Sequence, residues 1–545
     1  MDLVDRNVTV PAPTGRNSRR GDAKVYLVGG GIASLAAAAF MIRDGDILGR
    51  EITIFEESDK IGGSLDGAGS ARDGYVLRGG RMLERKYLCT YDLFSSIPAL
   101  DGTRTVTDEI FAWNETMKTS SKSRLVRDGR RQTAPDFGLS ERHILTIERL
   151  AIEPEGMLGR GTIADQFDPA FFKTDFWFMW CTTFAFQPWH SAVEFKRYLV
   201  RFVHMVSGFS RLEGIMRTVY NQYDSLVRPL HRWLDERGVV FALDTEVTDL
   251  RFSASSGAET VDTIVCRRGS RLDDVAVRAK DLVLVTLGSM TEASSLGGMD
   301  KAPVLKGRDD GGAWSLWETI ADGRPQFGRP STFDGHINES NWVSFTTTLH
   351  DETFLRIVRD ITGNVPGEGG LITFPESNWL ASIVIPHQPH FIGQPVDVSV
   401  FWGYGLAVDK PGDFVAKPML ACTGREIMTE VMGHLRVAPE AQTEILATSI
   451  CIPCMMPFIT SQFLRREKGD RPQIIPEGAT NLAFMGQFCE LPDDVVFTVE
   501  YSIRSAQTAT YALLGLKREP PPVYRGRLDP RVLAKAFKAL HDIHA

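Results

Sequence analysis

The stretch that decides the fold is Lys24-Val-Tyr-Leu-Val-Gly-Gly-Gly-Ile-Ala-Ser34, followed by Leu35-Ala-Ala-Ala-Ala-Phe40. An apolar run breaks into glycines and continues into alanines, which predicts a strand, a tight turn and the start of a helix. Gly29 and Gly31 occupy the first two glycine positions of a dinucleotide fingerprint, where the bare backbone can approach a pyrophosphate. The helix N-terminus adds free N–H groups for that anion. Ser34 stands at the third glycine position, and its small side chain still permits close packing of helix and strand.

A second predicted strand, Glu51-Ile-Thr-Ile-Phe55, ends at Glu56. Glu56 follows Gly31 by 25 residues, near the place expected for a carboxylate that binds a ribose hydroxyl. The alternative is a glycine-rich turn in some other α/β fold. Strand, turn, helix, strand and acid in this order favour a dinucleotide site.

A second glycine pair favours FAD over NAD. The segment from Glu56 continues to Gly62-Gly63-Ser64, and this pattern resembles that of glutathione-reductase-like flavoproteins, where it contacts the dinucleotide again. Two distant segments predict buried strands that end in small-residue turns of the same fold: Asp281-Leu-Val-Leu-Val-Thr-Leu-Gly288-Ser289 and Asn481-Leu-Ala-Phe-Met-Gly486-Gln487. A segment with helical character, from Phe497 to Leu514, follows the second of them.

The composition is that of a globular protein. The chain has 545 residues, of which 43% are hydrophobic and 24% charged, so it can form a large core and two to four domains. Its net charge of −8 argues against nonspecific nucleic-acid binding. No apolar run approaches the ~18 residues that span a bilayer. Met1 to Asp22 is polar and lacks a secretory core, so we expect a flexible arm there and a cytoplasmic location.

The cysteines do not predict a metal site. Seven are scattered through the chain, which is typical of a protein in a reducing cytosol. Cys451-Ile-Pro-Cys454 has the spacing of a redox pair or of half a zinc site. No second cysteine or histidine pair accompanies it, and we therefore favour structural thiols.

The nucleotide-binding fold is predicted to be discontinuous. We expect an α/β protein whose Rossmann-type FAD domain combines residues 23–100, 220–288 and 471–515. Two α+β inserts, residues 101–219 and 289–470, would form the substrate and lid region, and residues 516–545 a C-terminal helical segment.

Two helices are predicted in these regions. Ser191-Ala-Val-Glu194 predicts a capping box that opens a helix carrying Tyr198, after an aromatic-rich stretch that suits either a core or an apolar substrate. Asp529-Pro530 predicts an N-cap and first helical position, with Leu533, Phe537 and Leu540 on one apolar face. That helix would either contact a membrane surface or pack on its own protein.

Short tags along residues 23 to 525 resemble the oleate hydratase family, once called myosin cross-reactive antigen. The tags that carry the resemblance include Gly62-Gly-Ser-Leu-Asp-Gly67, Leu77-Arg-Gly-Gly-Arg81, Phe184-Ala-Phe186, Tyr220-Asn-Gln-Tyr223, Gln388-Pro-His-Phe391 and Phe497-Thr-Val-Glu-Tyr-Ser502. The resemblance implies hydration of the cis double bond of an unsaturated fatty acid, such as oleate to 10-hydroxystearate. It also implies non-covalent FAD, most active when reduced, although hydration is redox-neutral.

The resemblance assigns site residues. Tyr198 matches the tyrosine thought to protonate the alkene. We expect the flavin near a wider set, Gly29, Gly31, Ser34, Glu56, Gly62, Gly63, Ser64, Arg81, Val247, Gly288, Ser289, Gly486, Phe497 and Thr498.

The water-activating position departs from the family pattern. The family has an acid after Arg-Gly-Gly-Arg, and this chain has Met82, whose thioether cannot take a proton from water. Glu84 is the nearest carboxylate and would share a face with Met82 in an extended segment. Glu84 is either a relocated base or a surface carboxylate.

The carboxylate-binding positions also depart. Gln222 and His390 match the family, whereas Val384 and Pro386 stand where it has Thr and Asn. Two hydrogen-bonding side chains are therefore missing, and His387 is a candidate replacement. Two other functions stay open: a redox flavoenzyme related to amine oxidases or desaturases, and a fatty-acid-binding flavoprotein without turnover.

Overall fold

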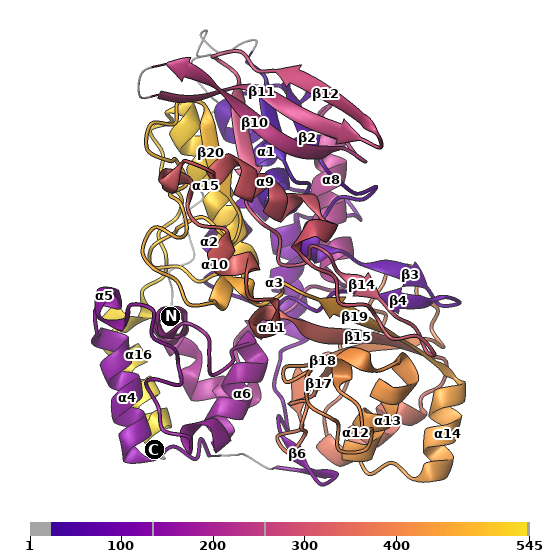
Figure 1. The fold of residues 1–545 in the computed structure, drawn as a ribbon. Coiled ribbons are helices and arrows are strands. Elements are labelled where there is room, and N and C mark those ends of the chain that lie inside the picture. Colours follow the sequence, from indigo (N-terminus) through magenta and orange to yellow (C-terminus); the bar gives the residue numbers. More distant parts are fainter. Residues whose placement is uncertain (1–22, 133–135, 256–257, 542–545) are drawn as a thin grey trace.

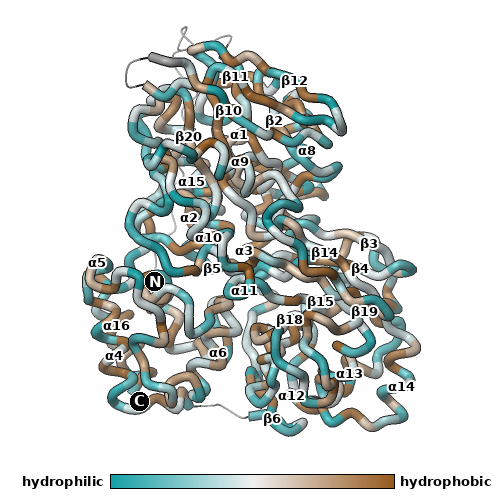
Figure 2. Tube along the Cα trace, viewed as in Figure 1, coloured by the Kyte–Doolittle hydropathy of each residue, from teal (hydrophilic) through white to brown (hydrophobic). Residues whose placement is uncertain are grey.

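The computed structural model describes residues 23–132, 136–255 and 258–541 (Figure 1). The predicted arm, residues 1–22, lies outside the described residues. Figure 2 shows hydrophobic and hydrophilic residues interspersed along the elements of every part of the chain.

A five-stranded parallel sheet forms the centre of the first unit. Its order is β20 (Leu482–Met485), β13 (Leu282–Thr286), β1 (Val25–Val28), β2 (Ile52–Phe55) and β9 (Val240–Ala242). These strands come from all three segments that we assigned to the nucleotide fold. Long stretches of the chain thus meet in one sheet, as the α/β prediction requires.

Helix α1 (Ile32–Gly45) begins directly after the glycine turn and packs closely on the sheet and on α15 (Val499–Leu514). Its alanines, residues 36–39, are buried, and side chains this small let the helix approach its neighbours. Helix α8 (Arg228–Asp235) also contacts α1, and α2 (Leu88–Phe94) packs on α15. The crowded α1 surface therefore explains the alanine run in the sequence.

An antiparallel sheet covers the outer side of this unit. Its strands are β10 (Glu246–Ser255), β11 (Ala258–Arg268) and β12 (Arg271–Ala276), and α9 (Gly312–Ala321) packs against β10. Because α9 belongs to the second insert, that insert also covers the nucleotide unit.

The second insert builds a six-stranded antiparallel sheet. Its order is β14 (Ser295–Leu296), β19 (Ser449–Met456), β15 (Trp342–Leu349), β18 (Ser399–Gly405), β17 (Ser382–Val384) and β16 (Leu371–Thr373). Helices α12 (Thr353–Thr362), α13 (Gly424–His434) and α14 (Pro439–Ala447) lie beside it (Figure 1). Cys451 and Cys454 are buried in β19 and form no disulfide.

A hairpin from the first segment joins the nucleotide unit to this sheet. The hairpin pairs β3 (Ala68–Ser70) with β4 (Gly74–Val76), and β4 packs on β15. The Thr346 and Thr348 hydroxyls accept hydrogen bonds from the Leu77 and Tyr75 backbone N–H groups. The chain that follows the glycine pair therefore runs straight into the substrate region.

A helical unit completes the molecule. It contains α4 (Glu141–Ile152), α5 (Glu155–Leu158), α6 (Asp175–Phe184) and α7 (Ala192–Arg201), and the C-terminal helix α16 (Pro530–Leu540) lies alongside α4 (Figure 1). Asp529 caps α16 by accepting a hydrogen bond from the Arg531 backbone, as predicted. The remaining α-helices are α3 (Val106–Thr116), α10 (Ser331–Asp334) and α11 (Ile337–Ser340).

The predicted capping box of α7 is wrong. Helix α7 does begin after Ser191, but the Ser191 side chain makes no capping hydrogen bond. The Ser191 backbone N–H donates instead to the Phe463 carbonyl. Glu194 binds two buried guanidinium groups, from Arg466 and Arg471. Charged partners outcompete a single backbone N–H for a buried carboxylate.

Candidate functional site

A cavity of about 460 Å³ lies at the carboxyl ends of the parallel strands. Open α/β sheets bind ligands at this edge. The lining includes Gly29, Gly31, Glu56, Gly63, Ser64, Val247, Gly288, Ser289 and Gly486. Most of the predicted cofactor residues thus meet in one place, although the sequence separates them by up to several hundred positions.

The glycine turn leaves room for a ligand to contact the protein backbone. Gly29 has a φ of +90°, which L side chains rarely adopt. A Cβ atom on Gly30 would lie 2.8 Å from the Glu56 Oε2 atom. The Glu56 carboxylate accepts hydrogen bonds from the Gly30 and Ser58 backbone N–H groups, over 2.7 and 2.9 Å. The acid therefore faces the turn, as a ribose-binding carboxylate does.

Two predicted cofactor residues support the turn without lining the cavity. Ser34 is buried, and its hydroxyl lies 3.3 Å from that of Thr286 on β13, which joins α1 to the sheet. Gly62 has a φ of +119° and its N–H donates to the Gly30 carbonyl. Both residues therefore stabilise the shape of the glycine turn and do not contact the cavity directly.

A second cavity, of about 80 Å³, contains the predicted reaction residues. Met82, Glu84 and Tyr198 all line it, together with Arg81, Phe497 and Thr498, which we expected near a flavin. Arg81 donates to the Ser64 carbonyl, and its guanidinium lies 5.7 Å from the centre of the Phe497 ring. Since Ser64 lines the nucleotide cavity, Arg81 links the two spaces.

Tyr198 is buried and its hydroxyl is fixed. The phenol donates a hydrogen bond to the Val496 carbonyl over 2.6 Å. Burial raises the pKa of Tyr198 well above its ordinary value, and the negative charges of Glu194 and Asp494 add to this. The phenol is therefore protonated at neutral pH, which is the form that a general acid needs.

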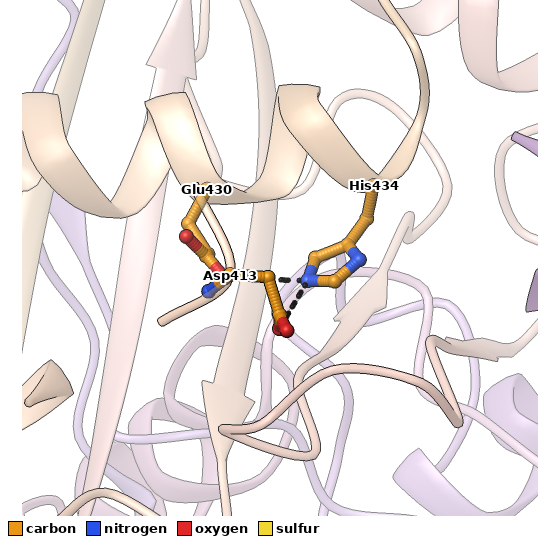
Figure 3. A group of neighbouring side chains, drawn as sticks. All are labelled: Asp413, Glu430 and His434. Atoms are coloured by element: carbon orange, nitrogen blue, oxygen red, sulfur yellow. Dashed lines mark hydrogen bonds and ion pairs between the residues drawn. The ribbon is translucent and has the colours of Figure 1, made fainter. Parts of the chain in front are cut away.

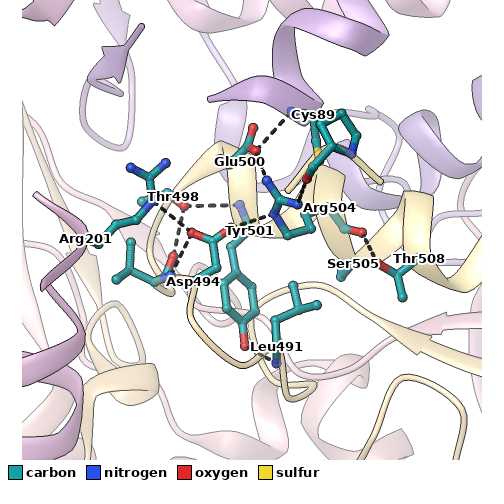
Figure 4. Close-up of polar contacts among 12 residues, drawn as sticks. Cys89, Arg201, Leu491, Asp494, Thr498, Glu500, Tyr501, Arg504, Ser505 and Thr508 are labelled. Atoms are coloured by element: carbon teal, nitrogen blue, oxygen red, sulfur yellow. Dashed lines mark hydrogen bonds and ion pairs between the residues drawn. The ribbon is translucent and has the colours of Figure 1, made fainter. Parts of the chain in front are cut away.

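Ion pairs along one side of α7 fix the position of Tyr198. Arg197 binds Glu155 and Glu490, each over 2.9 Å or less. Arg201 binds Glu84 over 2.9 Å and lies 3.5 Å from Asp494. Figure 4 shows Asp494 between Arg201 and Arg504, and Arg504 also binds Glu500. Buried charges are tolerated because each has partners of opposite sign.

The Glu84 carboxylate is heavily engaged. Its Oε1 accepts from Arg201, its Oε2 accepts from the Lys86 backbone over 2.6 Å, and His204 lies 3.4 Å away. Burial raises the pKa of Glu84, but His204 and Arg201 outweigh this and hold it below its ordinary value. A lowered pKa makes the carboxylate a weaker proton acceptor.

A third cavity, of about 30 Å³, holds the predicted carboxylate-binding residues. Gln222, Pro386, His387 and His390 line it. Gln222 donates to the Gly79 carbonyl over 2.8 Å. Val384 does not line it: this side chain is buried in β17, which pairs with β16 and β18.

His390 is uncharged at neutral pH. Burial lowers its pKa to about 3, and the positive charge of Arg217 contributes. Its Nε2 atom has no hydrogen-bond partner among the described residues. The imidazole can therefore act as a neutral hydrogen-bonding group toward a ligand, but not as a counter-charge.

Arg217 lines the same cavity and was missed in the sequence. Burial lowers its pKa to about 10, so the guanidinium stays charged at neutral pH. In the described part of the chain, no carboxylate forms an ion pair with Arg217, and its Nη2 atom is unpartnered. A partly buried cation without a counter-ion is costly, and an anionic ligand would remove that cost.

The chain matches the MCRA family over residues 22–511. It belongs to the MCRA family. The resemblance seen in the sequence is therefore confirmed.

Two curated relatives of this MCRA family chain are hydratases. An oleate hydratase of Streptococcus pyogenes serotype M49 (strain NZ131) is 38% identical over 95% of this chain and 89% of its own. A linoleate hydratase of Lactiplantibacillus plantarum is 32% identical over 95% of this chain and 98% of its own. The likeness spans nearly the whole of each protein.

The fold of this MCRA family chain also occurs among solved structures. An oxidoreductase from Methanosarcina mazei superposes with a TM-score of 0.51 at 13% identity, over 89% of this chain and 98% of that one. Identity this low concerns the fold alone. Within the described residues, no helix has the length and apolarity to cross a membrane.

Proposed function

We propose that this chain hydrates the cis double bond of an unsaturated fatty acid, with FAD bound non-covalently. The names of the two hydratase relatives support the substrate class. One observation carries the reaction: a protonated, buried phenol, Tyr198, in an apolar cavity that Arg81 connects to the nucleotide cavity. Hydration adds a proton to one alkene carbon and hydroxide to the other.

Tyr198 would deliver the proton. Alkenes are weak bases, so the acid must be held in a dry site where developing positive charge is stabilised. Phe184 and Phe202 supply the dry surroundings, with ring centroids 5.0 and 5.4 Å from that of Tyr198. The phenol must first turn away from Val496, because its single proton is used in that hydrogen bond.

FAD is the dinucleotide we assign to the first cavity. The residues present fit it, because the glycine turn admits a phosphate and Glu56 faces the ribose position. A bound flavin would supply an electron-rich ring system beside the reacting carbons, and we expect the reduced form to be the most active. None of the lining residues suggests a covalent linkage.

Water activation is the step at which the residues of this chain differ from the family pattern. Met82 cannot accept a proton, and Glu84 is held by Arg201, Lys86 and His204. We propose that water is oriented by backbone groups and the flavin, or that Glu84 acts as a weakened base. The first alternative requires no carboxylate to leave its ion pair, because the proton that water loses can return to the Tyr198 phenolate, directly or through a second water.

The fatty-acid carboxylate would bind in the third cavity, with Arg217 replacing the two donors that Val384 and Pro386 lack. Arg217 is charged and unpartnered, whereas His390 is neutral and Gln222 already donates to Gly79. A guanidinium can bind a carboxylate with two parallel hydrogen bonds. This placement orients the substrate head away from Tyr198.

We propose that the acyl chain follows a series of neighbouring cavities from the third cavity toward α16. The third and second cavities share Gly80, Arg81 and Trp402. The second shares Phe184, Phe202, Met205 and Ile215 with a small apolar cavity, which shares Trp180 and Val206 with a larger one of about 570 Å³. Leu533, Phe537 and Leu540 of α16 line that last cavity.

Helix α16 would form the mouth of this route. Leu533 and Phe537 are 44% and 48% exposed, so the apolar face is only half covered by the protein. Lys535 and Lys538 flank it, and a basic amphipathic helix suits an anionic membrane surface. We propose peripheral membrane contact here, where a lipid substrate would enter.

Product analysis tests the proposed function. Purified protein loaded with FAD and a reductant is incubated with oleate in H₂¹⁸O, and products are examined by mass spectrometry. A hydroxy acid carrying one ¹⁸O supports hydration. Oxygen consumption with an oxidised product would instead identify a redox flavoenzyme, and oleate binding without any product would identify a non-catalytic binder.

A further inference from the structure

A cluster of one imidazole and three carboxylates lies in the unit of the six-stranded sheet, apart from the cavities described above. Glu430 and His434 stand one turn apart on α13, and Asp413 comes from the loop after β18 (Figure 3). His434 Nε2 lies 3.3 Å from Glu430 Oε1 and 3.5 Å from Asp413 Oδ2. Glu376 Oε1 lies 3.9 Å from the other ring nitrogen, Nδ1.

The imidazole at the centre of this cluster is buried and unsatisfied. The His434 side chain is 2% exposed. Neither ring nitrogen meets hydrogen-bond geometry with the residues that the structure describes, and the nearest polar atoms are carboxylate oxygens at 3.3 to 3.9 Å. Nearly all buried polar groups in proteins are paired, so this side chain points to a missing partner.

The same cluster also lacks a positive charge. Glu430 is buried and receives three backbone N–H groups, from Asp413, Phe414 and Val415, over 2.6 to 2.9 Å. Within the described ranges, the recorded ion pairs of Asp413, Glu430 and Glu376 involve His434 alone, with no lysine or arginine. The site therefore offers several carboxylate oxygens to a cation, with no lysine or arginine recorded against them among the described residues.

We propose that Asp413, Glu430 and His434 bind a divalent transition-metal cation of the zinc class. Their ligand atoms all lie within 4.8 Å of one another. Around zinc at ~2.0–2.1 Å, tetrahedral ligands stand roughly 3.3 Å apart. The two nitrogen-to-oxygen distances of 3.3 and 3.5 Å match this spacing. Imidazole and carboxylate ligands together favour zinc or its neighbours over magnesium or calcium.

The surroundings hold these ligands as a metal site requires. The Asp413 carboxylate accepts the Asn378 backbone N–H over 2.8 Å, so its direction is fixed. Glu376 lies on the Nδ1 side, where a carboxylate orients a metal-bound imidazole by accepting its N–H. Side chains of Asp413 and Glu376 are 30% and 37% exposed, which leaves a solvent side for access and for a fourth ligand, water.

A cation here would join segments that are distant in the sequence. It would link α13 to the loop at Asp413, and through Glu376 to the hairpin at Asp128, whose N–H donates to Glu376. Since none of these residues lines the substrate or nucleotide cavities, the expected role is to stabilise this unit. The inference does not depend on the proposed hydration.

Zinc titration of the full-length protein tests the site. After removal of metal with a chelator, we expect one tightly bound zinc per chain by elemental analysis and a rise in the melting temperature on zinc addition. Asp413→Asn keeps the shape and the contact with Asn378 but removes the charge, and should weaken zinc binding at least tenfold. His434→Gln should do the same.

Controls separate this site from adventitious binding. His350→Gln changes an exposed histidine elsewhere and should bind zinc like the parent. If His434→Gln fails to fold, Asp413→Asn still decides, because its side chain is partly exposed. Absence of a one-to-one zinc complex in the parent protein, or unchanged zinc affinity in Asp413→Asn, would overturn the proposal.

Discussion

The hydroxyl group of Tyr198 donates a hydrogen bond to the carbonyl oxygen of Val496, 2.6 Å away. Val496 directly precedes Phe497, which has a φ of +67°, and Thr498, which caps α15. The candidate acid is therefore tied to the segment that leads into the helix behind the nucleotide cavity. Any shift of that segment on cofactor binding would reach the phenol.

Tyr198→Phe should abolish most hydration without unfolding the protein. Loss of a general acid commonly costs ~10²–10⁴-fold in rate. The ring keeps its packing, and the Val496 carbonyl loses one hydrogen bond, worth about 1 kcal/mol. Turnover and melting temperature are measured together. Tyr524→Phe removes a hydroxyl from a tyrosine that lines none of the cavities described and is a matched control. Parental turnover in Tyr198→Phe would exclude the phenol as the acid.

Substitutions at Met82 and Glu84 distinguish the possible ways in which the attacking water is activated. If the site lacks a base, Met82→Glu should raise turnover. If Glu84 is the base, Glu84→Gln should lose activity while Met82→Glu gains little. If backbone and flavin suffice, Met82→Glu should have little effect on turnover.

Stability measurements complete that comparison. Breaking the buried pair of Glu84 with Arg201 is expected to cost about 3–5 kcal/mol. Activities are therefore compared at equal flavin occupancy and below the melting temperature of each variant. A drop in activity that disappears after this correction would assign Glu84 a purely structural role.

Arg217→Met should weaken binding of free fatty acids while stabilising the substrate-free protein. A hydrogen bond to a charged group is worth ~1.5–3 kcal/mol, which corresponds to roughly a 10–100-fold rise in KM. Removing a partly buried charge without a counter-ion should leave the melting temperature equal or higher. Fatty-acid methyl esters, which carry no charge, should be insensitive to the change.

An exposed arginine provides the control for that experiment. Arg211→Met lies outside the third cavity and should leave both substrates unaffected. Equal KM values for free acid in Arg217→Met and the parent would reject the carboxylate site while leaving hydration itself untouched.

Glu56→Ala should weaken FAD binding at least tenfold. The change removes the carboxylate that faces the glycine turn and its hydrogen bonds to Gly30 and Ser58. Binding is followed by flavin fluorescence quenching. Glu51→Ala, five residues earlier in the short turn that leads into β2 and outside the cavity, serves as the control. Identical flavin affinity in the two variants would contradict the assignment.

Acid should destabilise the protein through Glu194. Burial raises its pKa, but Arg471, Arg466 and Arg197 outweigh this and lower it to about 2, against an ordinary 4.5. A depressed pKa stabilises the fold above about pH 4.5, and this contribution is lost as pH falls toward 2. Denaturation curves between pH 7 and 3 should show a smaller loss in Glu194→Gln, which starts about 3–5 kcal/mol less stable.

The local parts of the nucleotide site could be predicted from the sequence. Gly29, Gly31 and Glu56 lie within one βαβ unit, where spacing alone determines position. The start of helix α7 was predicted after Ser191, but the capping box was wrong, because Glu194 binds Arg466 and Arg471, which lie 272 and 277 residues further along the chain. The prediction of Tyr198 and of the other residues of the second cavity depended on the family resemblance.

The remaining features arise from packing between distant segments. Arg217 looks like any other arginine until its burial and lack of a counter-ion are known. Likewise, no short sequence motif predicts that Asp413, Glu430 and His434 form a metal site. One proposed ligand lies in a loop, and the other two lie one turn apart on a helix. A sequence pattern reports local spacing, whereas these properties depend on which segments meet.

The order of the parallel sheet bears on how the chain is made. Strand β20 adds the outer edge beside β13 and begins only at Leu482, near the end of the chain. A ribosome therefore releases most of the protein before the sheet can be completed. Early termination before residue 482 should leave an unpaired β13 edge, which is an aggregation hazard and a target for chaperones.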